Sequence, residues 1–242
     1  MKPSAPPDDT AAALNLGARS GRPSTAVVAI LLCLCAATVF NQFTQRWPGL
    51  SWFHAALVVV ALTASIAALT PTLAGVNVLM AGGLAGAIGG MAHAISSVTG
   101  FPFGHWEFTA AAGPRWLGLI PWWLPVAWAV MALSSRGTAR LLLRKSRNHP
   151  QHGYHVILLA TSLAILSALA LQAFALHGGR YWKPGPDGSL LHLLGHALHL
   201  FIQVAITPLL IEKFPGPRPP NYRPLLVYAG VNAVLLAALV AP

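Results

Sequence analysis

Seven long apolar runs, separated by short polar segments, follow one another along the chain. Each run approaches the ~20 residues that an α-helix needs to cross the hydrocarbon core of a bilayer. The pattern therefore predicts an all-α, polytopic membrane protein with about seven transmembrane helices. The expected spans are residues 25–43, 52–70, 74–98, 117–133, 155–176, 190–212 and 224–240.

The first 24 residues differ from the rest of the chain. They are rich in Pro, Ala and Asp and show no apolar periodicity, which is typical of a disordered segment. We expect residues 1–24 to form a disordered cytoplasmic tail and residues 25–242 to form a single helical membrane domain. Arg19 and Arg22 precede the first apolar run, as in a signal sequence. Because that run is long enough to span, we expect an uncleaved signal anchor.

The composition excludes an ordinary soluble protein, since 55% of the residues are hydrophobic and 8% are charged. The net charge of +10 does not point to nucleic acid, because the 15 Lys and Arg residues lie mainly between the apolar runs. On the expected topology, 11 of them fall on the N-terminal side and four on the opposite side; the 11 include Arg136 and Arg140, assigned to the loop after the fourth run. The positive-inside rule then predicts a cytoplasmic N-terminus and an external C-terminus. We expect the membrane to be a bacterial inner membrane, which makes the C-terminus periplasmic.

The sixth run carries polar residues that a membrane helix seldom exposes to lipid. His192, His196 and His199 recur at i, i+4 and i+7, so they share one helical face. Ionisable groups within a membrane are costly unless they face a protein interior or a wet cavity, and by default they mark function. The same arrangement also suits interhelical hydrogen bonding without chemistry. Single histidines near helix ends, such as His54 and His177, fit the membrane interface.

The third run supplies a surface on which another helix can pack. Gly82, Gly86 and Gly90 form a stripe of small residues at four-residue spacing, which allows close helix–helix approach. His93 lies three residues beyond Gly90, on the same side. We therefore expect His93 to face protein, in a common interior cavity with the histidines of the sixth run.

The loop after the third run is dense in aromatic residues and reads TGFPFGHWEFT from residue 99 to residue 109. Glu107 is the only acidic residue between Asp9 and Asp187. One interpretation is a solvated carboxylate in an interfacial loop. The other is a proton donor held among rings, since burial raises a carboxyl pKa and keeps the group protonated near neutrality.

This loop and the helix after it resemble the membrane-bound carotenoid biosynthesis proteins of the carotenoid 1,2-hydratase and bisanhydrobacterioruberin hydratase type. That family carries a Thr-Gly-x-Pro-Phe-Gly-x-Tyr-x-Tyr-like stretch and then a Gly-x-x-Pro-x-x-x-Pro-x-x-Trp helix. The matching residues here are 99–109 and 118–128, and the resemblance extends over roughly residues 90–144. Trp106 and Phe108 stand where the family has tyrosines, and Glu107 lies between them.

The resemblance implies an integral membrane enzyme of carotenoid or isoprenoid lipid biosynthesis, a lyase that adds water to a terminal C=C bond of an acyclic carotenoid. Such acid–base catalysis needs a proton donor, a group that positions water, and brief stabilisation of a tertiary cation. The candidate catalytic residues are Glu107, His93, His105, His196 and His199. The candidate substrate-binding residues, whose ring faces suit a cation, are Phe103, Trp106, Phe108 and Trp182.

Hydration requires no metal or organic cofactor, and the expected partners are a lipid-soluble isoprenoid substrate and membrane lipids rather than nucleic acid. Two other classes stay open. His192, His196 and His199 also suit iron, copper or haem, as in a membrane oxygenase or an electron-transfer protein. A non-catalytic membrane subunit is the remaining alternative.

Overall fold

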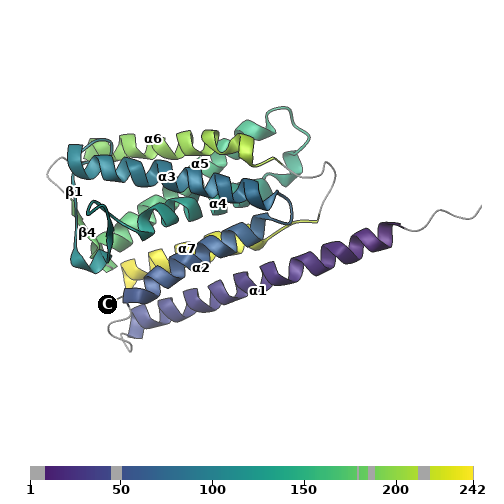
Figure 1. Cartoon of the computed structure of the whole chain (residues 1–242), viewed down its shortest axis with the longest axis horizontal. Helices are drawn as coiled ribbons and strands as arrows, with labels where there is room; N and C mark the ends of the chain where they lie inside the picture. Colours follow the sequence, from purple (N-terminus) through teal and green to yellow (C-terminus); the bar gives the residue numbers. More distant parts are fainter. Residues whose placement is uncertain (1–8, 45–50, 179, 185–188, 212–218, 242) are drawn as a thin grey trace, which may run out of the picture.

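A computed structural model describes residues 9–44, 51–178, 180–184, 189–211 and 219–241. Its described part contains seven α-helices, which run roughly along one common axis (Figure 1). They are α1 (Asp9–Thr44), α2 (Ser51–Leu69), α3 (Gly75–Thr99), α4 (Trp123–Leu142), α5 (His152–Ala173), α6 (Ser189–Ala205) and α7 (Arg223–Val240). Each overlaps one of the seven apolar runs, so the all-α architecture is confirmed.

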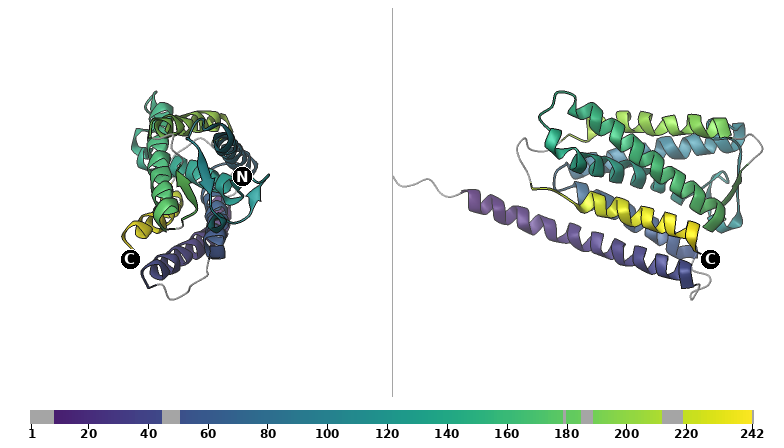
Figure 2. Two further views of the ribbon diagram at one scale, coloured as in Figure 1. Left: turned by 90° about the vertical axis from the view of Figure 1, so that its left-hand side faces the viewer. Right: turned by 180° about the vertical axis from the view of Figure 1, so that it is seen from behind.

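Helix α4 lies at the centre of the bundle, where it packs against α2, α3, α5 and α7. Most of its side chains from Trp123 to Ala139 are buried. Helix α1 lies at the edge, beside α2 and α7, and its N-terminal turns extend beyond the other helices (Figure 2). This arrangement makes α4 the scaffold from which side chains reach the interior.

Four helical segments of the described chain are long and apolar enough to cross a membrane. They are Ser24–Thr44, Gly75–Thr99, His152–His177 and Arg223–Val240, and two shorter apolar helices cover His54–Leu69 and Gly195–Leu209. The chain therefore has the character of an integral membrane protein. That all seven helices span the bilayer stays a prediction.

The fourth helix begins and ends later in the chain than the sequence predicts. It begins at Trp123 rather than at residue 117, and the residues before it form a small antiparallel pair of strands, β2 (Arg115–Trp116) and β3 (Ile120–Pro121). Neither proline of this segment interrupts the interior of the helix, because Pro121 lies in β3 and Pro125 lies in the first turn of α4. A proline is tolerated there, since the first backbone N–H groups of a helix have no intrahelical acceptor.

The helix also extends further than expected at its other end, so Arg136 and Arg140 belong to α4 and not to a loop. Arg136 is only 3% exposed and donates to the carbonyl of Gln203 (3.5 Å) and to Oγ1 of Thr207 (3.1 Å). Arg140 donates to the carbonyl of Leu210. Cations near a helix C-terminus are favourable because the last carbonyls lack intrahelical donors and carry partial negative charge. The two arginines thus bind α4 to the end of α6.

The N-terminal segment is helical over its described part. Helix α1 begins at Asp9, so it includes residues 9–24 of the segment expected to be a disordered tail. Residues 1–8 lie outside the described residues. The extent of disorder in this tail, and the division into a tail and a single membrane domain, stay predictions.

Two further strands close the end of the bundle at which α7 ends (Figure 1). Strand β1 (Trp106–Phe108) follows α3, and strand β4 (Trp182–Pro184) precedes α6. They pair antiparallel although they are far apart in the sequence. A short π-helical turn, η3 (Phe174–Gly178), continues α5 towards β4.

Candidate functional site

The β1–β4 pair forms an aromatic lid over one end of the bundle. Phe108 lies opposite Trp182 and Glu107 lies opposite Lys183. Because successive side chains of a strand point to opposite faces, Trp106 and Phe108 turn inward while Glu107 turns outward. The solvent exposure agrees: Trp106, Phe108 and Trp182 are each 7% exposed, whereas Glu107 is exposed. The interpretation of Glu107 as a carboxyl held among rings is therefore wrong for its position in this structure.

The segment before β1 is anchored to the end of α3 through Ser96. The Ser96 hydroxyl accepts a hydrogen bond from the backbone N–H of Phe103 (3.0 Å) and donates one to the carbonyl of Gly104 (2.7 Å). These bonds direct the Phe103 ring onto α6 at Gly195, where a Cβ atom would lie 2.0 Å from the ring. Only a glycine at position 195 allows this close approach.

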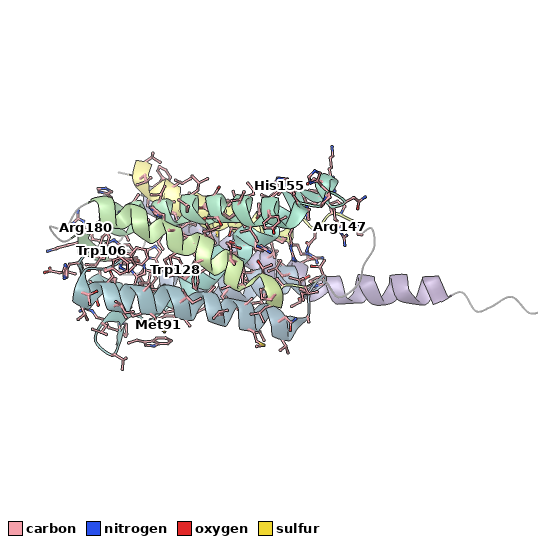
Figure 3. All side chains as sticks on the ribbon, turned by 90° about the horizontal axis from the view of Figure 1, so that it is seen from above. Met91, Trp106, Trp128, Arg147, His155 and Arg180 are labelled. Atoms are coloured by element: carbon pink, nitrogen blue, oxygen red, sulfur yellow. The ribbon has the colours of Figure 1, made fainter. Side chains whose placement is uncertain are left out.

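Phe103 begins a series of stacked rings that connects three helices. The imidazole of His93, on α3, stacks on Phe103 with ring centroids 4.3 Å apart and planes inclined by 15°. On the other side, Trp128 of α4 stacks on His199 of α6 at 4.3 Å and 19°, and His199 is followed by His196 at 6.3 Å. Trp128 itself lies against α3 at Gly89, where a Cβ atom would be 2.2 Å from the indole. Along the bundle, Trp128 lies further from the lid end than Trp106 does (Figure 3).

These rings enclose a small space, which we call the histidine cavity, of about 50 Å³. It is lined by His93, Phe103, Trp106, Phe108, Leu124, Trp128, Met131, Ala168, Leu171, Gln172, Trp182, His196 and His199. The expectation that His93 and the sixth-run histidines share an interior cavity beneath the aromatic loop is thus confirmed for His93, His196 and His199. All four candidate substrate-binding residues also line it.

The histidine cavity contains polar groups that can form hydrogen bonds with an occupant. The indole N–H groups of Trp128 and Trp182 are buried and have no hydrogen-bond partner among the described residues. Buried polar groups are normally satisfied by protein or by ordered water. A cavity of this volume has room for a water molecule, which needs two to four polar partners. The cavity therefore suits a water molecule held between indoles and imidazoles.

Two candidate catalytic residues do not line this cavity. Glu107 and His105 are exposed, and His105 lies against the end of α3 at Gly100. The side chain of His192 lies outside the described part of the chain. The candidate catalytic residues thus divide into an inner group of three histidines and an outer group at the lid.

A larger apolar chamber, of about 430 Å³, lies between α2, α4, α5 and α7. It shares Met131 and Leu171 with the histidine cavity, so these two side chains lie between the two spaces. Its volume falls within the ~300–1,000 Å³ that is usual for small-molecule sites. At its lid end, the hydroxyl of Tyr181 lies 2.7 Å from Nδ1 of His54. Apart from this pair, the chamber is lined almost entirely by aliphatic and aromatic side chains.

Tyr181 is held firmly in this position. Its backbone N–H donates to the carbonyl of Ala175 (2.8 Å), and its own carbonyl accepts from the N–H of Thr109 (2.8 Å). Burial raises the pKa of Tyr181 to about 12. The phenol is therefore neutral at physiological pH, and it presents an O–H group to its surroundings.

The model of the carotenoid biosynthesis protein family matches residues 53–191 of the chain. The chain belongs to this family. No curated protein and no solved structure shows a significant match to it.

The part of the chain that matches the carotenoid biosynthesis family extends from α2 to the beginning of α6. It includes both strands of the lid, the central helix α4, and the His54–Tyr181 pair of the chamber. His192, His196 and His199 lie beyond the matched residues. The matched residues therefore include the lid and most of the chamber lining, whereas the α6 histidines lie outside them.

A metal site would require several donor side chains grouped around one point. Among the described residues, the His, Cys, Asp and Glu side chains form no group of three or more that suits a metal ion. His196 and His199 are near each other, but their rings are stacked, and the third member of the triplet, His192, has no described side chain. Binding of iron, copper or haem by these histidines stays a prediction.

Sequence reasoning missed the chamber and its polar pair. His54 was interpreted as an interfacial residue, because nothing near it in the sequence suggests otherwise. Its partner Tyr181 is 127 residues away. The one available signal is that Tyr181 directly precedes Trp182, a candidate substrate-binding residue.

Proposed function

We propose that this membrane protein of carotenoid biosynthesis is a hydratase that adds water to a terminal C=C bond of an acyclic carotenoid. The observation that carries the proposal is the contact between two unlike spaces. The apolar chamber suits a hydrocarbon end, and the histidine cavity suits water and acid–base groups. Met131 and Leu171 line both.

The reaction divides between these spaces. The π electrons of the terminal C=C bond take a proton, which forms a new C–H bond and leaves a tertiary cation on the neighbouring carbon. A water oxygen then attacks that carbon and gives up a proton, so the product is a tertiary alcohol. The balance requires only water, and the proton delivered in the first step is recovered in the last.

The inner histidines are the groups best placed to handle these protons. His93, His196 and His199 line the cavity from two helices. A protonated imidazole can act as the acid and a neutral one can orient water. Trp128 and Trp182 line the same space, and indole rings can stabilise a cation. Glu107 and His105 are exposed at the outer face of the lid, and we assign them no part in the proton transfers.

The proposed substrate reaches the chamber from the bilayer. Apolar surfaces and membrane helices suit a lipid-soluble isoprenoid and lipid neighbours. We place the protein in a bacterial inner membrane, with the N-terminus cytoplasmic and the lid on the periplasmic side, on the basis of the Lys and Arg distribution. No metal or organic cofactor takes part in this scheme.

The decisive experiment is expression of the chain in a host that accumulates lycopene or a related acyclic carotenoid, followed by mass spectrometry of the pigments. A gain of one water mass per modified end is the expected result. A gain of one oxygen atom would favour the oxygenase alternative, and unchanged pigment in cells that contain the folded protein would favour the non-catalytic subunit. Either of these results contradicts the proposed hydratase.

A further inference from the structure

We infer that the apolar chamber binds the hydroxyl-bearing end of an acyclic isoprenoid alcohol, and that the His54–Tyr181 pair is the group that recognises the hydroxyl. The inference rests on the proposed function only in taking an isoprenoid as the chain of the ligand. It adds a polar end group to that ligand and a binding role to two residues outside the histidine cavity.

The pair is complementary to an alcohol in either tautomer of the imidazole. If Tyr181 donates to Nδ1 of His54, the imidazole has an N–H at Nε2 left to donate, and the phenol oxygen can still accept. If Nδ1 carries the proton and donates to Tyr181, the phenol O–H is left to donate, and Nε2 can accept. In either arrangement the Tyr181 hydroxyl keeps one further hydrogen-bonding position, as an acceptor in the first and as a donor in the second. An alcohol hydroxyl can fill either position, because it both donates and accepts.

The surroundings of the pair restrict what else can bind. Tyr181 is packed among the rings of His54, Phe174 and Trp123, with centroids 5.4–6.1 Å apart. The indole N–H of Trp123 is already used, since it donates to the carbonyl of Ala112 at 2.9 Å. Among the described residues, none bonds Nε2 of His54. The rest of the chamber wall is mainly aliphatic and aromatic, so a ligand with a single hydroxyl and a long apolar body fits best.

The position of Tyr181 makes this recognition rigid. Its backbone is fixed by the bonds to Ala175 and Thr109 described above, and its neutral phenol cannot become a charged group that would repel an apolar ligand at physiological pH. A site that can hydrogen-bond a hydroxyl favours an alcohol over an analogue that lacks the group, because the analogue leaves the second hydrogen-bonding position of the Tyr181 hydroxyl unfilled. The chamber should therefore prefer an alcohol over the matched hydrocarbon.

The test is equilibrium binding of radiolabelled farnesol to the purified full-length protein in lipid nanodiscs, in competition with unlabelled farnesene or hexadecanol. Farnesene is an acyclic isoprenoid hydrocarbon of the same chain length, and hexadecanol is an alcohol without the branched chain. We expect farnesol to bind tighter than farnesene by about 2- to 10-fold for each hydrogen bond formed, and tighter than hexadecanol. Equal affinity for farnesol and farnesene would overturn the hydroxyl recognition, and equal affinity for farnesol and hexadecanol would overturn the isoprenoid class.

Variants assign the effect to the pair. Tyr181→Phe keeps the ring and removes the hydroxyl, so farnesol affinity should fall about 2- to 10-fold while farnesene affinity stays unchanged. Tyr228→Phe is the matched control, because its hydroxyl donates to the carbonyl of Leu163 (2.9 Å) and Tyr228 does not line the chamber. An unchanged farnesol preference in a folded Tyr181→Phe protein would remove the pair from recognition. The wild-type comparison needs no variant and decides the case if Tyr181→Phe does not fold.

These results are separable from those of the pigment assay. Farnesol preference without any hydration of carotenoids would contradict the hydratase and leave the alcohol site standing. Hydration of carotenoids without a preference for farnesol would contradict the alcohol site and leave the hydratase standing.

Discussion

The imidazole of His199 lies face to face with the indole of Trp128, with ring centroids 4.3 Å apart and planes inclined by 19°. His199 is 3% exposed and Trp128 is equally buried. The stack restricts the plane of the imidazole, and therefore the directions in which its ring nitrogens can point. A restricted orientation favours a general acid or a water-positioning group.

The first prediction follows from this stack. His199→Phe keeps a flat ring on Trp128 but removes both nitrogens, so hydration of the carotenoid should fall by ~100- to 10,000-fold, the range for loss of a general acid or base. The amount of folded protein should stay close to wild type. Pigment mass spectrometry beside thermal denaturation of the purified protein measures both.

His155→Phe is the matched control. His155 is exposed on α5 and lies at the end of the bundle away from Trp106 (Figure 3). It should keep full activity. Near-normal hydration by His199→Phe would remove the α6 histidine from the mechanism.

The second prediction concerns the outer carboxylate. Glu107 is exposed on the outward face of β1, opposite Lys183. Glu107→Gln should therefore lower activity by less than about 10-fold, well below the loss expected for a general acid. Rates measured in membranes that contain equal amounts of each protein decide the point. A loss of 100-fold or more with an unchanged melting temperature would return the role of acid to Glu107.

Much of the fold was accessible from the sequence, because apolar runs of membrane length leave few alternatives to helices. One helix boundary that failed was the end of α4, because Arg136 was taken as a loop residue. Its charge is accommodated inside the bundle by the carbonyl of Gln203 and the hydroxyl of Thr207, and those acceptors lie about 70 residues away in the chain. The pattern of charges along α4 alone contains no sign of them.

The candidate site was accessible only in part, for a similar reason. The spacing of the α6 histidines and the aromatic loop each mark a local surface, and their convergence is what the fold adds. The outward direction of Glu107 depends on the pairing of β1 with β4, and the His54–Tyr181 contact depends on α2 meeting the turn before β4. Long-range pairings of this kind are set by tertiary packing and not by local sequence.

The third prediction concerns metal and haem. Hydration as proposed uses only water and protein groups, so activity should survive treatment with a chelator. The purified protein should contain less than one equivalent of iron or copper per chain by elemental analysis, and it should show no haem absorption band. A stoichiometric metal whose removal abolishes activity would contradict the hydratase scheme and support ligation by the α6 histidines.

The fourth prediction concerns orientation. The ends of α1 and α7 that are nearest the termini lie at opposite ends of the bundle (Figure 1), as an odd number of crossings requires. With a cytoplasmic N-terminus, alkaline phosphatase fused after residue 242 should be active and a fluorescent protein fused there should stay dark. The opposite pair of results would place the lid on the cytoplasmic side.

The last prediction concerns the glycine on which the Phe103 ring packs. In Gly195→Ala, the new methyl group would lie 2.0 Å from Cδ1 and 2.3 Å from Cε1 of Phe103, so the ring must move and its stack on His93 must open. Overpacking of this kind costs about 1–3 kcal/mol. Gly83→Ala on α3 is the matched control, because its methyl group would meet nothing within 4 Å. Both variants gain the same helix propensity of up to about 1 kcal/mol, so the difference between their melting temperatures isolates the clash. We expect Gly195→Ala to melt lower than Gly83→Ala and to lose most of its hydration activity, whereas equal melting and equal activity would show that Phe103 does not pack on α6 as described.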